Sequence, residues 1–115
     1  MDVPTPDTVA HYADMLAAMG AEPRLRIVRL LLAAHPTGMI AGNIGTALGI
    51  ASSTLSHHLE RLKREDVVTV RRHGTCLWYS ANAETLEGLL QFLFAECCER
   101  NCCVSPDRFV TATGQ

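Results

Sequence analysis

Ala51-Ser52-Ser53-Thr54-Leu55-Ser56-His57-His58-Leu59-Glu60-Arg61-Leu62-Lys63 is the segment on which the predicted architecture depends. Leu55, Leu59 and Leu62 recur at helical spacing, so they predict an apolar face that anchors a short helix. The start and the outer face of this helix carry small hydrogen-bonding side chains, and basic residues follow. Such a helix suits the major groove of DNA, although an ordinary surface helix has the same pattern.

The residues before this segment favour the first of these interpretations. Ile44 and Leu48 are apolar residues four apart, and Gly49 follows them. A helix that ends in glycine, a tight turn and a second short helix form a helix-turn-helix. Gly45 is small where two crossing helices would approach each other.

The residues after the segment predict a β-hairpin. Residues 67–72 form a β-branched run, residues 73–75 a turn, and residues 76–79 a second such run. A helix-turn-helix followed by a hairpin is a winged helix. The predicted fold class is therefore mainly α (α+β), with one β-hairpin wing.

Three further helices complete the prediction. The first begins after Thr5 as its cap, and the second begins at Pro23 and is apolar nearly all round, hence central. Arg24, Arg26 and Arg29 are expected at its solvated edge. The stripe of the first helix consists of Val9, Tyr12, Ala13, Leu16 and Met19.

The last helix is expected to begin near residues 83–85. One of its faces carries Leu86, Leu89, Leu90, Leu93 and Cys97. So apolar a terminal helix exceeds what one small core needs. We therefore expect a homodimer through the first and last helices, in which each helix-turn-helix reads one half of a palindromic site.

Length and composition agree with a small DNA-binding domain. The chain has 115 residues, of which 48% are hydrophobic, which predicts one domain over residues 1–103 and a flexible tail over 104–115. No apolar run is long enough to span a bilayer and no signal peptide is visible, so we expect a cytoplasmic protein without a membrane partner. The net charge is −2, but residues 52–73 hold five basic and three acidic residues, a local balance of +2.

The predicted partner is double-stranded operator DNA. The expected contacts from the recognition helix and from the wing, where side chains reach bases or phosphates, are Ser52, Ser53, Thr54, Ser56, His57, Arg61, Lys63, Arg71, Arg72 and His73.

Two segments resemble a known family. Residues 18–31, AMGAEPRLRIVRLL, and residues 53–62, STLSHHLERL, are similar to the second-helix and recognition-helix signatures of the ArsR/SmtB family of metal-sensing repressors. The resemblance covers about residues 8–95 and implies a homodimeric winged-helix repressor that releases its operator when an inducer binds. It also implies that His58 turns inward. The family often has serine where this chain has Ala51, so the helix cap is expected to shift to Ser52.

Four of the five cysteines lie within residues 97–103: Cys97, Cys98, Cys102 and Cys103. Some arsenic-responsive members of the family carry a similar Cys-Cys pair at the end of the last helix, with another cysteine shortly after. The Cys-x-Cys site beside the recognition helix and the Asp-x-His and His pairs of the zinc and nickel sensors are absent from this sequence. The resemblance therefore implies As(III), or Sb(III), as the inducer, with no organic cofactor.

The chemistry of the cluster agrees with such an inducer. Thiolates are soft ligands, and trivalent arsenic takes three of them in a pyramid. In a regular helix Cys98 and Cys102 share a face, whereas Cys97 and Cys98 diverge by about 100°. Three sulfurs therefore converge only if the helix ends, for which Asn101 is suited. We expect Cys97, Cys98 and Cys102 as ligands, and Cys103 as a substitute or fourth ligand.

Other roles for these thiols stay open. The alternatives are a redox switch, a cadmium or zinc sensor, and incidental thiols in a frayed end of the helix. The usual zinc pattern is a pair of C-x₂-C motifs, which differs from CC-x₃-CC. A thiol enzyme is disfavoured because no His, Asp or Asn is placed to activate a nucleophile, so we expect no catalysis. Cys76 is interpreted as a small buried hydrophobic residue.

Overall fold

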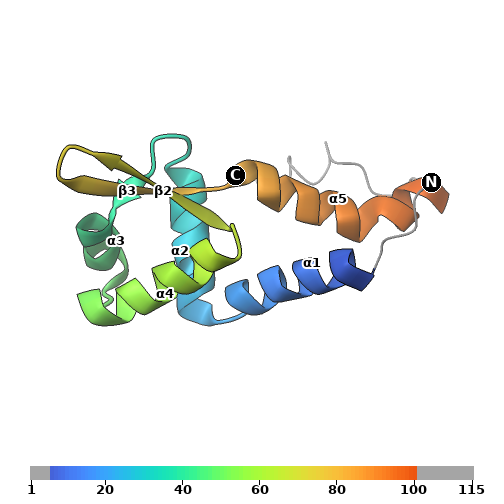
Figure 1. Cartoon of the computed structure of the whole chain (residues 1–115), viewed down its shortest axis with the longest axis horizontal. Helices are drawn as coiled ribbons and strands as arrows, with labels where there is room; N and C mark the ends of the chain where they lie inside the picture. Colours follow the sequence, from blue (N-terminus) through green and yellow to red (C-terminus); the bar gives the residue numbers. More distant parts are fainter. Residues whose placement is uncertain (1–5, 101–115) are drawn as a thin grey trace. The chain divides into compact units, whose positions relative to one another are not determined.

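A computed structural model describes the backbone of residues 6–100 and the side chains of residues 7–95. Its elements, shown in Figure 1, are α1 (Pro6–Met19), α2 (Glu22–Ala33), β1 (Met39–Ile40), α3 (Ala41–Leu48), α4 (Ser52–Arg64), β2 (Val68–His73), β3 (Cys76–Ala81) and α5 (Ala83–Arg100). The chain divides into two compact units, residues 1–85 and 86–115. The first unit holds a helix-turn-helix followed by a hairpin, so the predicted winged helix is confirmed. Thr5, the predicted cap of the first helix, lies outside the described residues.

The core of the first unit is built from one face of each of the helices α1 to α4 and from the strands β2 and β3. Its buried apolar side chains are Met15, Ala18, Ile27, Val28, Leu31, Ile44, Leu55, Leu59, Leu62, Val67, Val68 and Ala81. The central position of α2 is confirmed, because it packs against α1, α3, α4 and β3. However, Leu25 and Leu32 are 49% and 42% exposed, so α2 is buried on one side only.

Helix α1 buries a different face from the stripe that the sequence predicts. Met15 and Ala18 are fully buried, whereas Val9 and Leu16 are 48% and 45% exposed. The helix carries apolar side chains on two faces, and the pattern alone does not show which one the core covers. Val9 and Leu16 therefore remain as an apolar surface of α1.

The strands form one antiparallel sheet in the order β1-β3-β2. The predicted hairpin is confirmed, with pairs that run from Val68↔Ala81 to His73↔Cys76. Gly74, at φ 65°, begins the two-residue turn, because glycine adopts positive φ without strain. The two residues of β1 pair with Tyr79 and Trp78 of β3, a strand that the sequence analysis did not predict.

The interpretation of Cys76 as a buried residue is wrong. Its side chain is exposed because it lies at the tip of the hairpin, past the part of β3 that the core covers. The buried residues of this strand are Ser80 and Ala81, at its other end.

Candidate nucleic-acid interface

The turn between α3 and α4 fixes the position of the recognition helix. Gly49 ends α3 in the left-handed conformation, with φ 68° and ψ 36°. The carbonyl of Gly45 accepts hydrogen bonds from the amides of Gly49 and Ile50, the latter at 3.0 Å. A Cβ on Gly45 would lie 3.0 Å from the carbonyl oxygen of Ile50 and 3.5 Å from Cδ2 of Leu55, so the tight approach at Gly45 is to the turn and the contact with the crossing helix is an ordinary one.

Helix α4 is anchored by the three leucines that the sequence analysis selected. Leu55, Leu59 and Leu62 are 2%, 2% and 0% exposed. The expected shift of the cap to Ser52 is wrong: Ala51 is the N-cap without a side-chain bond, and Ser52 is the first helical residue. The carbonyl of Ala51 accepts the amide of Leu55 at 2.8 Å, so the backbone alone closes the first turn.

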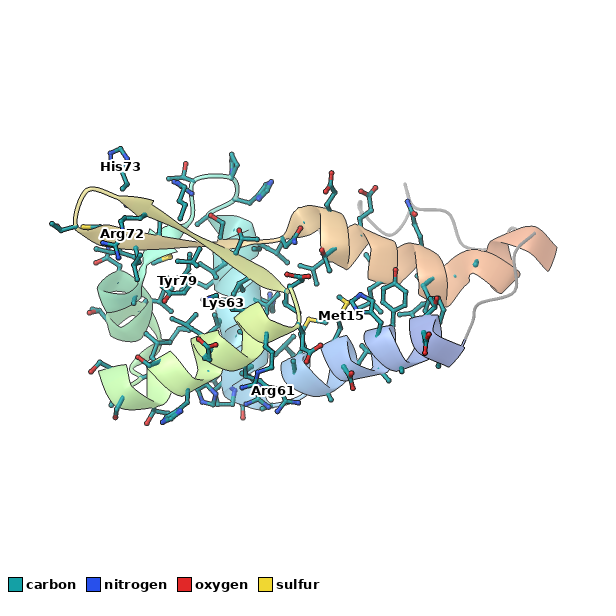
Figure 2. All side chains as sticks on the ribbon, viewed as in Figure 1. Met15, Arg61, Lys63, Arg72, His73 and Tyr79 are labelled. Atoms are coloured by element: carbon teal, nitrogen blue, oxygen red, sulfur yellow. The ribbon has the colours of Figure 1, made fainter. Side chains whose placement is uncertain are left out.

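The predicted contacts on α4 do not form one patch. Most are exposed, and Arg61 is half-buried. At about 100° per residue, Ser53 and His57 lie opposite the leucines, whereas Arg61 and Lys63 lie on opposite flanks. Figure 2 shows this separation of Arg61 and Lys63. Ser52 and Ser56 share the flank of Lys63, and Thr54 shares that of Arg61.

Arg64 is a basic residue that the predicted contacts did not include. It is exposed, and it follows His57 by seven residues, so it lies on the same outward stripe as Ser53 and His57. The spacing of seven was the sequence signal that would have found it. Glu60, which follows Ser53 by seven residues, is also exposed on this stripe, so the outward stripe combines hydrogen-bonding groups with one cation and one carboxylate.

A hollow of about 510 Å³ lies between α3 and the start of α4. Gly42, Gly45 and Gly49 line it from one side, and Ser52 and Ser56 from the other. The three glycines have no side chains to fill the hollow, and the two serines supply hydroxyl groups to it. Serine hydroxyl groups are among the side-chain donors that commonly bind phosphate oxygens.

The wing brings its three predicted contacts to the same end of the first unit as the start of α4, as Figure 1 shows. Arg71, Arg72 and His73 are all exposed. Figure 2 shows Arg72 and His73 on opposite sides of the hairpin, as the alternation along a strand requires. Arg71 and His73 therefore share one face of the hairpin, and Arg72 lies on the other.

Arg71 is already engaged within the protein. One terminal nitrogen, Nη2, donates to the carbonyl of Thr37 at 2.9 Å, and the other, Nη1, donates to Oγ of Ser80 at 3.3 Å. Its guanidinium carbon lies 5.6 Å from the ring centroid of Trp78.

His58 lies on the inner side of α4, beside Arg24 of α2. Nη1 of Arg24 is 3.3 Å from Nδ1 of His58, and Nε of the same arginine donates to the carbonyl of Ala18. Burial, and then the charges of Arg24 and His57, lower the pKa of His58. Arg24 thus joins α1, α2 and α4, which corrects its prediction as a solvated residue. Arg26 does lie at the exposed edge, paired with Glu22 at 2.6 Å.

The predicted metal site cannot be located from the described side chains. The backbone places Cys97 and Cys98 in the last turn of α5, but their side chains lie outside the described residues, as do Cys102 and Cys103. Among the side chains of residues 7–95, no group of three or more His, Cys, Asp or Glu is arranged to hold a metal ion. None of the helices within residues 6–100 has the length and apolarity that crossing a bilayer requires.

These features define a winged helix-turn-helix protein. A family model described as a helix-turn-helix domain matches residues 19–71. The transcriptional activator HlyU of Vibrio cholerae is 28% identical over 87 residues, which are 76% of this chain and 78% of HlyU. The putative arsenical resistance operon repressor ArsR2 of Halobacterium salinarum is 31% identical over 87 residues, which are 76% of this chain and 71% of ArsR2.

The solved structures include the homodimeric winged helix-turn-helix domain Mb0332 of Mycobacterium bovis, titled a possible ArsR-family regulator. It has a TM-score of 0.62 and 26% identity, and the match covers 88% of this chain and 94% of that domain. The chain therefore belongs to the ArsR/SmtB family of winged-helix transcriptional regulators, as the sequence resemblance predicted.

Proposed function

We propose that this chain is a homodimeric repressor that binds operator DNA through α4 and the wing and releases it when As(III) binds the C-terminal cysteines. The observation that carries the DNA-binding part is the division of α4 into a buried leucine face and an exposed face with Ser53, His57 and Arg64. An exposed polar stripe on a rigidly anchored helix suits base and phosphate contacts in the major groove.

The dimer is supported by apolar side chains that the core leaves exposed. Val9 and Leu16 of α1 and Leu93 of α5 are 48%, 45% and 51% exposed. The solved Mb0332 domain, to which this chain is similar, is homodimeric. A two-fold dimer would present two copies of α4 to successive major grooves about 34–36 Å apart.

The inducer is supported by the chemistry of the cluster and by the name of one relative. Four thiols within residues 97–103 offer three soft ligands to trivalent arsenic. ArsR2 is named as an arsenical resistance repressor, whereas HlyU is named as an activator. Arsenite bound at the end of α5 would change the relation of the two recognition helices, and a coupling of about 1–3 kcal/mol gives roughly 5- to 150-fold release.

Fluorescence anisotropy tests this proposal with labelled DNA from upstream of the protein's own gene. Protein is titrated first, then arsenite, and then zinc or cadmium, all under reductant. Cys97→Ser should bind the DNA with unchanged affinity and lose the response to arsenite, because it removes one proposed ligand and leaves the residues of α4 and the wing unchanged. Cys76→Ser is the matched control and should respond like the wild type.

The outcomes distinguish an arsenic sensor from a redox switch at the C-terminal cysteines. Release by arsenite in the Cys97→Ser protein would remove Cys97 from the essential ligands. If arsenite, zinc and cadmium all fail to release the DNA, and an oxidant added in a second titration without reductant does release it, the thiol redox switch would replace the arsenic sensor. Wild-type protein that does not bind this DNA at low salt would contradict the proposed DNA-binding function for this target.

A further inference from the structure

Arg71 links the wing to the segment that leads into the helix-turn-helix. Its two terminal nitrogens reach Thr37 in the loop before β1 and Ser80 on β3. Arg71 and Trp78 are direct cross-strand partners, and the guanidinium lies over the Trp78 ring. One side chain therefore contacts both strands of the hairpin and the α2–β1 loop.

The loop that Arg71 binds is held tightly against β3. Gly38 has φ +83°, and a Cβ at this position would lie 2.3 Å from the carbonyl oxygen of Tyr79 and 2.4 Å from Oγ of Ser80. The amide of Gly38 donates to the carbonyl of Ala34 at 3.0 Å, which ties the loop to the end of α2. The chain enters α3 at Ala41, three residues after Gly38, so a fixed loop fixes the start of the helix-turn-helix.

We propose that Arg71 is a positioning residue that sets the wing relative to the helix-turn-helix, rather than a phosphate contact. This proposal rests on the proposed DNA-binding function. A guanidinium that donates to a carbonyl and a hydroxyl in different directions uses its planar fork, which a lysine does not possess. Arg72 and His73, on either side of the tip, are the wing residues left to meet DNA.

The charge-conserving variant Arg71→Lys tests the proposal. A phosphate contact depends chiefly on positive charge, so lysine would preserve it, whereas the two-pronged link requires arginine. Arg71→Lys and Arg71→Ala should therefore both weaken binding of the upstream DNA, by up to about tenfold, because lysine cannot bridge the two acceptors and alanine reaches neither. Neither should change the slope of log affinity against log salt.

Arg72→Ala is the matched control for a wing arginine that meets phosphate. Loss of one phosphate contact lowers that slope by about 0.9, which distinguishes it from the Arg71 variants. Arg71→Lys that binds DNA like the wild type, or Arg71→Ala that lowers the slope as Arg72→Ala does, would overturn the proposal.

A second measurement needs no DNA, so it separates this proposal from the proposed function. Trp78 is the single tryptophan of the chain, and acrylamide quenching reports how far its ring is covered. Both Arg71 variants should increase quenching in the DNA-free protein, and Arg72→Ala should not. Equal quenching in all four proteins would overturn the link, whereas the expected quenching without any wild-type DNA binding would refute the proposed function alone.

Discussion

Neighbouring histidines of α4 have different surroundings, because one residue rotates the helix by about 100°. His57 is exposed on the outward stripe, whereas His58 is half-buried beside Arg24. The same arginine donates to Ala18 at the end of α1. His58 thus belongs to the support of α4, and His57 belongs to its exposed outward stripe, which we propose meets DNA.

The position of His58 predicts a loss of stability in acid. Burial and the charge of Arg24 lower its pKa in the folded protein below the ordinary value of 6.5. The unfolded chain therefore takes up the proton more readily, and the free energy of unfolding should be retained above pH 6.5 and fall as the pH drops below it. Thermal unfolding followed by circular dichroism between neutral and mildly acidic pH measures this.

Substitution at His58 should flatten that pH dependence. His58→Gln keeps a polar group near Arg24 and cannot take up a proton. His73→Gln, at the exposed wing tip, is the control and should keep the acid loss of the wild type. Equal pH profiles for wild type and His58→Gln would assign the loss to other groups.

The loop between α2 and β1 has no room for a side chain at Gly38. Gly38→Ala combines a left-handed φ with contacts of 2.3 and 2.4 Å to β3, so it should lower the free energy of unfolding by about 2–4 kcal/mol. Gly42→Ala, in α3, meets no atom within 4 Å and should lie within about 1 kcal/mol of the wild type. Urea unfolding compares the two, and similar losses would contradict the loop packing.

The elements that the sequence predicts correctly are those that residues close together in the chain determine. The leucines of α4, the glycine turn before it and the hairpin follow from spacing within a few residues, and all were found. Strand β1 was missed because two residues show no alternation. The face of α1 was misjudged because Met15 and Val9 are both apolar, and only the partner elements decide between them. The bond from Arg71 to Thr37 joins residues 34 positions apart, which no local pattern reveals.

At the scale of the whole molecule, the exposed apolar residues of α1 predict how the protein associates. Leu16→Glu places a charge where Leu16 is 45% exposed, so it should convert the proposed dimer to a monomer and leave the helical content unchanged. Sedimentation velocity at micromolar concentration measures the change. Leu77→Glu, on the wing, is the control and should remain dimeric. A dimeric Leu16→Glu protein would exclude this face of α1 as an essential interface.

The exposed thiol of Cys76 offers a labelling site for measuring distances within the proposed dimer. A spin label attached there, in a chain whose C-terminal cysteines are replaced by serine, would sit directly across from His73 at each wing tip. The distance between the two labels would follow the spread of the wings when DNA binds. The same thiol also gives alkylating and oxidising reagents a second target beside the DNA, so inhibition by such a reagent is attributable to the C-terminal cluster only in a Cys76→Ser background.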